Sequence, residues 1–369
     1  MRVALVHDWL TGFRGGEKVL LELARMFPAA DLYTLVHVAG TVSPEIERLN
    51  VVPSPLSAMP GAARHYRKLL PLFPWAIERF RLEGYDLVIS TSHSFAKGAR
   101  VPPGTPHLCY CFTPIRYVWD LADEYLGRGP KRLLAAPLLA WLRSWDRRTS
   151  SPARIRQVVA ISHAIADRVR RAWGRDASVV YPGVDVGRFE RLDPRPGDFF
   201  FMLGGFVPYK AEGLAIEAFR GTGQSLVIAG DGPTRAALER GAPPNVRFLG
   251  RVSDAELEDL YARCRALVYP QNEDFGIIAV EAQAAGKPVI ALARGGALET
   301  VVGPNDPQGR PPTGAFFADP TPESLRAALA AFAELEPKLD PHAIRANATR
   351  FSLESFRAGI TRAIEGVVK

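Results

Sequence analysis

The chain has 369 residues, of which 47% are hydrophobic and 23% charged, a globular composition that excludes a disordered or fibrous protein. Its length exceeds one ordinary core and fits two domains of roughly 150–200 residues each. The formal charge of +7 is unevenly divided: residues 1–180 hold 25 basic and 15 acidic side chains, net +10, and residues 181–369 hold 21 and 24, net −3. Any basic surface should therefore belong to the first half.

Cysteine usage and hydropathy point to a reducing, aqueous compartment. Cys109, Cys111 and Cys264 are too few to cross-link such a chain. Cys109 and Cys111 have no second Cys/His pair nearby, so same-face positions of a strand are favoured over metal ligands. The first apolar run, residues 3–6, has only four residues, so we expect no signal peptide, and the longest apolar run, residues 133–142, is about half of what spans a bilayer. We expect a cytoplasmic protein that does not cross a membrane.

Short β-branched runs recur along the chain, each followed by a turn and a helical pattern. Strands are predicted at residues 2–6, 86–90, 107–111 and 158–161 in the first half, and at 199–203, 225–229, 246–249, 266–269 and 288–291 in the second. Helices are predicted at residues 17–26, 211–219, 254–263 and 278–285. This alternation predicts an α/β protein with two parallel sheets, joined at the turn-rich residues 181–185. We expect two similar domains that face one another, with a ligand cleft between the carboxyl ends of their strands.

Two insertions in the first half, residues 59–82 and 126–156, mix bulky apolar residues with clustered cations. The cations are Arg64, Arg67, Lys68, Arg79 and Arg81 in the first insertion, and Arg128, Lys131, Arg132, Arg143, Arg147 and Arg148 in the second. This texture suits an interfacial helix on anionic lipid. A core-packed helix with a solvated face is the alternative, and the sequence leaves both open.

The first candidate motif is Arg14-Gly15-Gly16-Glu17-Lys18, directly after the first predicted strand and at the start of a helix. Gly15 and Gly16 allow the backbone to approach a ligand, and the start of the helix offers unpaired amides to an anion. The pattern is neither G-x-G-x-x-G nor a Walker sequence, so a plain tight turn explains it equally well.

A stronger motif places Glu273 and Glu281 eight residues apart around a strand-to-helix turn marked by Gly276. Glu273 is predicted on a loop at the carboxyl edge of the sheet, and Glu281 one turn into the helix. The amides of Ile277 and Ile278 should point at the space between them. Carboxylates suit sugar and ribose hydroxyls, and free amides suit a diphosphate. A sugar-nucleotide site therefore explains the motif better than a plain surface helix does.

The third motif is Leu203-Gly204-Gly205-Phe206-Val207-Pro208-Tyr209-Lys210, directly after the first strand of the second half. Glycines at a sheet edge followed by Lys210 suit a diphosphate, with a solvated lysine on a glycine-rich turn as the alternative. Other turns at strand ends are candidates to line the same pocket: Gly230-Asp231-Gly232-Pro233, Gly250-Arg251-Val252 and Arg294-Gly295-Gly296-Ala297-Leu298-Glu299.

Taken together, these motifs resemble the retaining glycosyltransferases of family 4, which have the GT-B architecture of two facing Rossmann-like domains. The resemblance runs essentially end to end and includes Gly15-Gly16-Glu17, residues 181–185, Val207-Pro208-Tyr209-Lys210, Glu273-x7-Glu281 and Gly295-Gly296. Several segments look like the mannosyltransferase branch that builds bacterial surface polysaccharides and commonly uses GDP-mannose: His7-Asp8-Trp9, Arg14 to Lys18, Thr113-Pro114-Ile115-Arg116-Tyr117, Trp119-Asp120, Glu273-Asp274-Phe275-Gly276 and Thr313-Gly314-Ala315-Phe316-Phe317.

The resemblance implies an acceptor-binding domain at residues 1–180, a nucleotide-sugar-binding domain at 181–350, and a closing helix in 351–369 that crosses back to the first domain. Glu273 would hold hydroxyls of the donor sugar, and Glu281 those of the ribose. Lys210 would neutralise the diphosphate. The full implied donor set is Gly15, Gly16, Gly205, Lys210, Arg251, Val252, Glu273, Phe275, Gly276, Ile277, Ile278 and Glu281. No metal or other cofactor is implied, and the chain contains no D-x-D element.

The sequence also departs from the family pattern. Gly205 stands where relatives commonly have an arginine five residues before the lysine; Arg294, Arg251 and Arg14 are candidate replacements. The run Ala211-Glu212-Gly213 replaces the usual basic residue and later aspartate.

A third departure lies in the first domain. Phe112 stands before Thr113-Pro114 where relatives often have a histidine, and it cannot donate a hydrogen bond. His93 is a candidate to reach the same site, with a core or capping histidine as the alternative. Asp120 is a candidate on the acceptor side, with a surface role as the alternative.

The leading hypothesis is a retaining glycosyltransferase that moves a hexose, mannose from GDP-mannose, to a lipid-linked or saccharide acceptor in surface polysaccharide synthesis. Peripheral contact with anionic lipid at the inner face of the cell membrane would suit the basic first half. The alternatives are a sugar-nucleotide 2-epimerase and a non-catalytic GT-B nucleotide-binding module. A dinucleotide dehydrogenase lacks its glycine fingerprint, and no reader motif supports nucleic acid as a partner.

Overall fold

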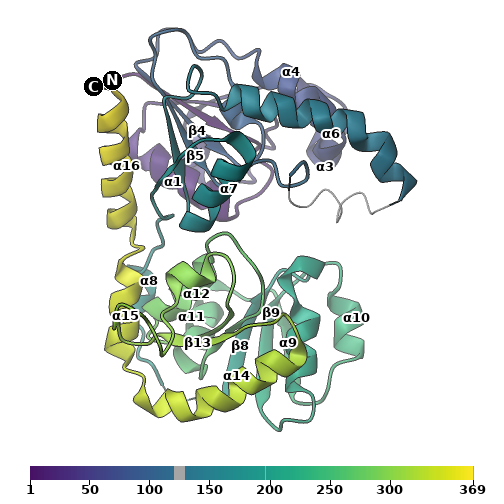
Figure 1. Cartoon of the computed structure of the whole chain (residues 1–369), viewed down its shortest axis with the longest axis vertical. Coiled ribbons are helices and arrows are strands. Elements are labelled where there is room, and N and C mark those ends of the chain that lie inside the picture. Colours follow the sequence, from purple (N-terminus) through teal and green to yellow (C-terminus); the bar gives the residue numbers. More distant parts are fainter. Residues whose placement is uncertain (120–128, 196, 369) are drawn as a thin grey trace. The chain divides into compact units, whose positions relative to one another are not determined.

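The computed structural model describes residues 1–119, 129–195 and 197–368. The chain divides into two compact units, unit 1 with Met1–Tyr181 and Phe356–Lys369, and unit 2 with Pro182–Ser355. Each unit contains one parallel sheet with helices on both of its faces (Figure 1). The predicted α/β class is therefore confirmed, with two Rossmann-like domains.

Unit 1 has a seven-stranded sheet in the order β3-β2-β1-β4-β5-β6-β7. Its strands are β1 Val3–His7, β2 Asp31–Thr34, β3 Asn50–Pro53, β4 Leu87–Ser92, β5 His107–Cys111, β6 Gln157–Ala160 and β7 Ser178–Val179. In the centre, Leu5 pairs with Leu32 on one side and with Ile89 on the other. β1, β4 and β5 are buried along their whole length, so their sequences show no alternation of apolar and polar positions, and β4 and β5 also bury polar side chains such as Ser90, Thr91 and His107.

The helical elements of unit 1 cover the sheet and extend beyond it. They are α1 Gly15–Met26, α2 Pro44–Glu47, η1 Pro55–Ala58, α3 Ala62–His65, η2 Tyr66–Leu72, α4 Phe73–Ile77, η3 Ala96–Gly98, α6 Pro130–Thr149 and α7 His163–Trp173. α16 Leu353–Val368 also packs on unit 1: Phe356 meets the Tyr110 ring at 5.7 Å, and Arg357 pairs with Glu22 at 2.6 Å. A Cβ at Gly359 would lie 2.7 Å from Val180, so glycine allows this close packing.

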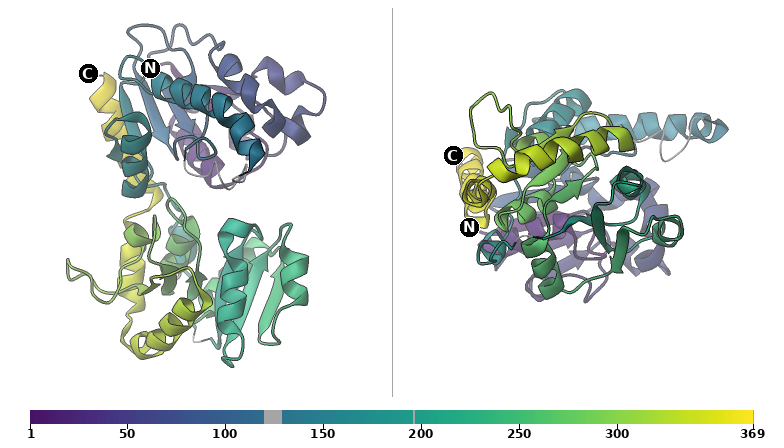
Figure 2. Two further views of the ribbon diagram at one scale, coloured as in Figure 1. Left: turned by 45° about the vertical axis from the view of Figure 1, so that its right-hand side comes forward. Right: turned by 90° about the horizontal axis from the view of Figure 1, so that it is seen from below.

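Unit 2 has a six-stranded sheet in the order β10-β9-β8-β11-β12-β13. Its strands are β8 Phe199–Gly204, β9 Ser225–Gly230, β10 Val246–Gly250, β11 Leu267–Tyr269, β12 Val289–Leu292 and β13 Gly314–Phe317. Its helices are α8 Gly187–Glu190, η4 Pro208–Lys210, α9 Glu212–Phe219, α10 Arg235–Arg240, α11 Asp254–Arg263, α12 Ile277–Ala284, α13 Ala297–Thr300, α14 Pro322–Leu335, η5 Glu336–Lys338 and α15 Pro341–Thr349 (Figure 2). The strand order reverses between β8 and β11, the position where such sheets bind ligands.

Each unit is built around its own apolar core. In unit 1 the core joins the β1–β4 region to Phe73, Phe95 and Trp145. In unit 2 it joins Phe200 and Met202 of β8 to helices α9 and α14. The two insertions differ in structure: residues 59–82 form the short segments α3, η2 and α4, whereas most of the second insertion forms the continuous helix α6. Among the described residues, no helix combines the length and apolar character needed to cross a membrane.

Candidate functional site

The carboxyl edge of the unit 2 sheet brings together Lys210 and Glu273. Lys210 ends η4, which follows β8, and Glu273 lies on the loop after the neighbouring strand β11. The Glu273 carboxylate contacts the Lys210 ammonium and accepts a hydrogen bond from the Tyr269 hydroxyl at 2.5 Å. The two charged side chains keep 20% and 24% of their surface exposed. A partly exposed cation and a partly exposed carboxylate are therefore in contact at this edge of the sheet.

The turn at Gly295-Gly296 packs against the backbone of the Glu273 loop and supports it. The Gly296 amide donates to the Glu273 carbonyl at 2.8 Å. A Cβ at Gly295 would lie 2.4 Å from that carbonyl oxygen, and one at Gly296 would lie 2.4 Å from the Phe275 Cα. The two glycines are thus required by close backbone packing. The sequence predicted that this turn lines the pocket; in the structure Gly295 and Gly296 support the Glu273 loop.

Gly276 forms the turn into α12. Its φ of +94° lies in the region that favours glycine, and a Cβ there would lie 2.6 Å from the Tyr269 hydroxyl oxygen. Ile277 and Ile278 begin α12, where the first amides have no acceptor within the helix. The structure thus places a helix start beside the Glu273 loop, as the motif predicts.

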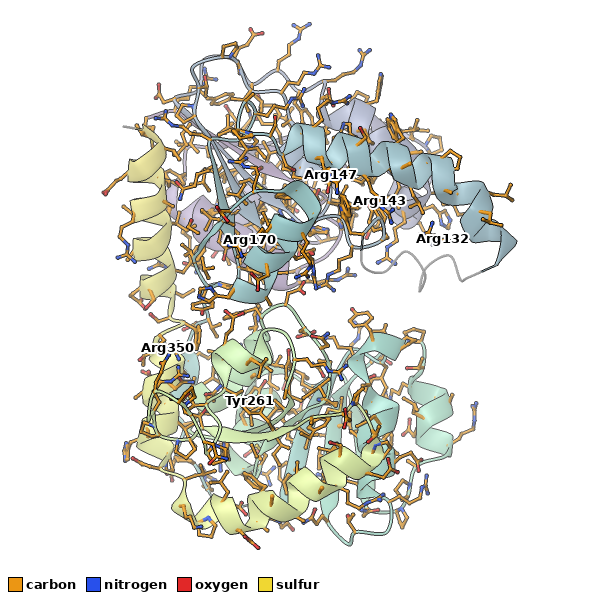
Figure 3. The ribbon with its side chains drawn as sticks, viewed as in Figure 1. Arg132, Arg143, Arg147, Arg170, Tyr261 and Arg350 are labelled. Carbon is orange, nitrogen blue, oxygen red and sulfur yellow. The ribbon has the colours of Figure 1, made fainter. Side chains whose placement is uncertain are left out.

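Glu281 lies within α12 and is buried, with 6% of its surface exposed. Its carboxylate accepts a hydrogen bond from the Tyr261 hydroxyl of α11 at 3.2 Å. Burial and the nearby Glu281 carboxylate raise the pKa of Tyr261 well above its usual value, so Tyr261 remains a hydrogen-bond donor. Tyr261 lies in the middle of unit 2 (Figure 3). Glu281 is therefore anchored inside the unit, whereas Glu273 lies closer to solvent.

The loop that carries Lys210 is conformationally strained. Phe206 (φ 44°) and Ala211 (φ 57°) flank it, and they are the non-glycine residues with positive φ in the described part of the chain. The buried Glu212 carboxylate accepts from the Phe206 amide at 2.7 Å and so holds the loop closed. Burial raises the pKa of Glu212. Backbone held in such conformations is concentrated at functional sites.

The remaining predicted donor residues of unit 2 differ in accessibility. Arg251 is 88% exposed and lies 3.8 Å from Asp231, and Val252 is half-buried. A Cβ at Gly205 would meet nothing within 4 Å, so the position has room for a side chain. The Phe275 ring packs against Phe351 at 5.5 Å, so any contact from Phe275 to a ligand would come from its backbone.

Gly15 and Gly16 of unit 1 begin α1 beside two ring systems. A Cβ at Gly16 would lie 3.6 Å from the Phe112 ring and 3.8 Å from the His7 ring. His7 lies 3.8 Å from the buried Glu17, whose carboxylate also accepts from the Arg14 amide at 2.9 Å. Burial tends to raise the pKa of Glu17, but His7 and the backbone amides outweigh it and lower that pKa.

Asp8 is fully buried at the end of β1 and holds the turn that follows β4. One carboxylate oxygen accepts the amides of His93 at 2.7 Å and Ser94 at 3.0 Å; the other accepts those of Phe95 at 2.5 Å and Ala96 at 2.7 Å. The turn at residues 93–96 is thus fixed by one side chain.

His93 lies on this turn with 32% of its side chain exposed. Its Nδ1 lies 3.0 Å from Asp8, and its ring lies edge-on to Trp9 at 4.5 Å and 6.3 Å from Phe112. Burial lowers the pKa of His93, and the Asp8 carboxylate opposes this effect. The structure therefore places His93 beside Phe112, where the sequence suggested a substitute. Asp120 lies outside the described residues.

The structure points to three further residues beside the candidate site to which the sequence assigned no role. The amide of Gln271, which is 1% exposed and follows β11, has no hydrogen-bond partner among the described residues. Tyr269 orients Glu273, and Asp8 orients His93. The positions of Tyr269 and Asp8 at the ends of predicted strands were the available signal for both.

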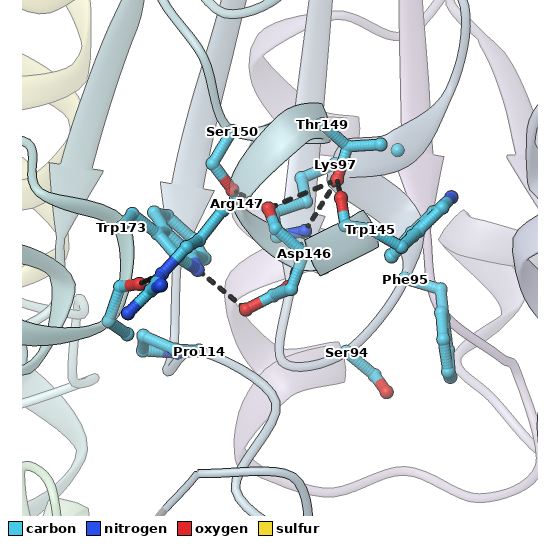
Figure 4. Close-up of polar contacts among 12 residues, drawn as sticks. Ser94, Phe95, Lys97, Pro114, Trp145, Asp146, Arg147, Thr149, Ser150 and Trp173 are labelled. Atoms are coloured by element: carbon cyan, nitrogen blue, oxygen red, sulfur yellow. Dashed lines mark hydrogen bonds and ion pairs between the residues drawn. The ribbon is translucent and has the colours of Figure 1, made fainter. Parts of the chain in front are cut away.

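Unit 1 contains a buried ion pair between Lys97 and Asp146 (Figure 4). The Lys97 ammonium lies 2.7 Å from Asp146, donates to Thr149 at 3.1 Å, and lies 4.7 Å from the centre of the Trp145 ring. The second Asp146 oxygen accepts from the indoles of Trp119 at 2.7 Å and Trp173 at 2.6 Å. The network thus fixes the residue that precedes Asp120.

Two family models match the chain. Glycosyltransferase Family 4 matches residues 13–188, and Glycosyl transferases group 1 matches residues 187–351. Together they cover almost all of both units, and the chain belongs to these glycosyltransferases, which have the GT-B fold.

Curated relatives match over shorter segments. An uncharacterized glycosyltransferase of Methanocaldococcus jannaschii is 31% identical over 153 residues, which are 40% of this chain and 42% of the relative. A D-inositol 3-phosphate glycosyltransferase of Mycolicibacterium paratuberculosis is 32% identical over 163 residues, 38% of this chain and 35% of the relative. The chain thus spans less than half the length of these curated relatives.

A solved structure matches over the full length. The Anabaena protein HepE, in complex with UDP, has a TM-score of 0.70 and 18% identity over 99% of this chain and 100% of that chain. At this identity the likeness shows the fold.

Proposed function

We propose that the chain is a retaining glycosyltransferase that moves a hexose from a nucleotide-sugar donor held by unit 2. The observation that carries the proposal is the contact between the Lys210 and Glu273 side chains beside the start of α12. An ammonium and free helix amides suit a diphosphate, and a carboxylate suits sugar hydroxyls. Family membership supports the same reaction class.

The proposed reaction requires the Lys210–Glu273 pair to separate. Lys210 then neutralises the diphosphate together with the amides of Ile277 and Ile278, while Glu273, still bonded to Tyr269, accepts hydrogen bonds from the sugar. Glu281 is assigned to the ribose. The bond between the anomeric carbon and the diphosphate oxygen breaks, and the acceptor oxygen bonds to that carbon on the same face. The acceptor proton passes to the leaving diphosphate, which gives retention. Stabilisation of the leaving group and positioning of the acceptor supply the catalysis.

We further propose GDP-mannose as the donor and a lipid-linked or saccharide acceptor. The resemblance of His7-Asp8-Trp9, the Thr113 to Tyr117 segment and Glu273 to Gly276 to the mannosyltransferase branch supports this donor. Lys210 and the α12 amides support catalysis without a metal, because they supply positive charge where a metal–diphosphate complex would otherwise be held.

The test is transfer of labelled mannose from GDP-mannose to lipid-linked saccharides, with UDP-glucose as the alternative donor and EDTA present. We expect a product with retained anomeric configuration, and its near-absence with Glu273→Gln. Glu239→Gln, an exposed position on α10, is the matched control. A folded protein that transfers nothing from any nucleotide sugar would overturn the proposal. Formation of an epimer without an acceptor would identify the 2-epimerase instead.

A further inference from the structure

A groove in unit 1 combines indole rings with arginines. It lies between α4 and α6 and has a volume of about 390 Å³; its lining is Pro74, Trp75, Glu78, Arg79, Arg100, Trp141, Trp145 and Arg148. Trp75 and Trp141 remain 49% and 46% exposed, whereas Trp145 is buried at the floor. None of these residues belongs to the donor or acceptor sites considered above.

The groove has an excess of positive charge. Its one carboxylate, Glu78, pairs with Arg100 at 2.7 Å and accepts from the Trp145 indole at 2.7 Å. Burial tends to raise the pKa of Glu78, but Arg100, Trp145 and Arg154 outweigh it and lower that pKa, so the carboxylate stays ionised. Arg100 thus balances Glu78. The other two arginines of the lining leave a net positive charge.

Those two arginines line the groove together with the indoles. The Arg79 guanidinium lies over the Trp75 ring, 4.5 Å from its centre, and Arg148 lies 4.0 Å from Glu78 with 64% of its side chain exposed. An anion that enters the groove would meet two guanidinium groups beside exposed indoles. Arginine is well suited to bind phosphate, and exposed tryptophans are typical of the boundary between lipid and water.

The helix that forms one wall of the groove exposes an apolar face. Leu133 and Leu134 are 77% and 83% exposed, and Leu138 is 41% exposed. The helical spacing of residues 134, 138, 141 and 148 places Leu134, Leu138 and Trp141 on the same face as Arg148. Arg143 and Arg147 belong to another face, where their guanidinium groups lie 5.5 and 4.9 Å from the centre of the Trp119 ring (Figure 3).

The surrounding sequence has almost no acidic side chains. Residues 59–81 contain five Lys or Arg and one acidic residue, Glu78, and residues 129–148 contain five and one, Asp146. Both acids are already paired, with Arg100 and Lys97. Leu72 adds a further exposed apolar side chain, at 44%, next to α4. Leu72, Trp75, Arg79, Leu133, Leu134, Leu138, Trp141 and Arg148 are called the α4–α6 surface below.

We propose that the α4–α6 surface docks on a bilayer containing anionic phospholipid. The leucines and Trp141 enter the interfacial layer, and the groove beside Trp75 receives a lipid phosphate at Arg79 and Arg148. Exposed apolar groups next to an excess of arginines over carboxylates match an anionic bilayer in both chemistry and sign of charge. A soluble polyanion would explain the arginines but would leave Leu133, Leu134 and Leu138 in water. The proposal concerns unit 1 alone and does not depend on the identity of the donor.

The first experiment is co-sedimentation of the full chain with vesicles of phosphatidylcholine, with and without 30% phosphatidylglycerol. We expect binding to the anionic vesicles, and a loss of at least about tenfold in partitioning when Leu134→Ser and Leu138→Ser are combined, because each leucine loses its apolar transfer free energy. Leu298→Ser, a 53% exposed leucine of unit 2, is the matched control and should bind as wild type.

The second experiment tests the arginines. Arg79→Gln with Arg148→Gln should lower binding about thirtyfold at low salt, since each of the two charges near an anionic surface contributes on the order of 1 kcal/mol. Arg240→Gln, an exposed arginine of α10, is the control. Brominated phosphatidylglycerol should quench wild-type fluorescence, and Trp141→Phe should reduce that quenching. Circular dichroism verifies that each variant is folded. Wild type that binds no vesicle, or a double-serine variant that binds as wild type, would overturn the proposal. Arginine-dependent binding to a soluble polyanion without vesicle binding would assign the surface to that partner instead.

Discussion

Two carboxylates at strand ends, Asp8 in unit 1 and Glu273 in unit 2, show opposite arrangements. Asp8 is fully buried, and its oxygens accept four backbone amides from residues 93–96. Glu273 is 24% exposed and contacts side chains, the Lys210 ammonium and the Tyr269 hydroxyl. Both follow a central strand of a parallel sheet, so position alone does not separate their roles.

The difference shows how a structural acid can be distinguished from a ligand-binding acid. Asp8 has its hydrogen-bonding capacity taken up by backbone, so it holds the His93 turn and has little left for a ligand. Glu273 is paired with the partly exposed Lys210 side chain, and we propose that a diphosphate attracts this lysine away and frees the carboxylate for hydroxyl groups. We therefore expect substitutions at Asp8 to act on folding and substitutions at Glu273 to act on turnover.

Glu273→Gln should have the largest effect on activity. An amide cannot accept from sugar hydroxyls with the strength of a carboxylate, and loss of one such charged contact costs about 10²–10³-fold in kcat. Thermal unfolding should stay within a few degrees of wild type, because the side chain is partly exposed. Steady-state sugar transfer checks this. Transfer within threefold of wild type would remove Glu273 from the site.

Asp8→Asn should act on stability. In asparagine an NH2 group replaces one carboxylate oxygen, so a donor would face the backbone amides that now donate to that oxygen. Breaking such a buried charged network costs about 3 kcal/mol. Urea unfolding of the variant measures the loss, with Asp254→Asn, whose side chain is 85% exposed, as the control. If the variant unfolds at the wild-type urea midpoint, the structural role of Asp8 is wrong.

A further structural group of unit 1, the buried His107, should make the stability of the protein depend on pH, because the fold holds its ring neutral. Burial lowers its pKa to about 4, and Ser90 at 2.8 Å and the Arg154 carbonyl at 3.1 Å satisfy both ring nitrogens. Between pH 6.5 and 4 the unfolded chain binds the proton and the folded chain does not, so stability falls as pH falls through this window. The contribution of His107 to the unfolding free energy is at most about 3–4 kcal/mol.

The measurement for His107 is the unfolding free energy against pH for wild type and His107→Asn. We expect a shallower decline in the variant over that window. Parallel curves would show that His107 does not control this part of the pH dependence.

Gly276→Ala should affect both stability and donor binding. The residue has φ +94°, and its new Cβ would lie 2.6 Å from the Tyr269 hydroxyl oxygen. Such strain costs about 1–3 kcal/mol and displaces the group that orients Glu273. Gly221→Ala is the matched control, since Gly221 has φ +73° but open space around its Cβ. Equal destabilisation of the two variants would contradict the steric contribution of Tyr269.

Gly205→Arg should give the smallest effect, a gain of about tenfold in affinity for a nucleoside diphosphate, because a second cation would join Lys210. Nothing lies within 4 Å of the new Cβ, so the fold should be unchanged. Gly129→Arg, also with open space, is the control for added charge. Unchanged affinity in equilibrium binding would show that the Gly205 position does not face the diphosphate.

Much of the fold could be predicted from sequence periodicity. The elements that the prediction missed were missed for physical reasons. The predicted runs form strands at nearly the predicted residues because they are apolar and bounded by turns. β2, β3, β7 and β13 escaped prediction. β3 and β7 lie at the two edges of the unit 1 sheet and are partly exposed, so they lack the apolar run that marks a buried strand. Residues 59–82 form broken segments instead of one helix, and Pro71 and Pro74 account for interruptions there.

The candidate site was predicted in its motif but not in its contacts. Spacing and glycine placement identified Glu273, Gly276 and Lys210. The pairing of Lys210 with Glu273 depends on the adjacency of β8 and β11, which are more than 60 residues apart, so no local pattern reveals it. The role of Asp8 likewise depends on contacts with residues 93–96.

The most direct test of the central claim, that Lys210 of unit 2 binds the donor diphosphate, is calorimetric titration of GDP and UDP into the metal-free protein. We predict binding in the presence of EDTA, tighter for GDP, and weakened at least about tenfold by Lys210→Met but not by Lys338→Met, an exposed lysine of η5. Wild type that binds neither nucleotide, or Lys210→Met that binds as tightly as wild type, would contradict it.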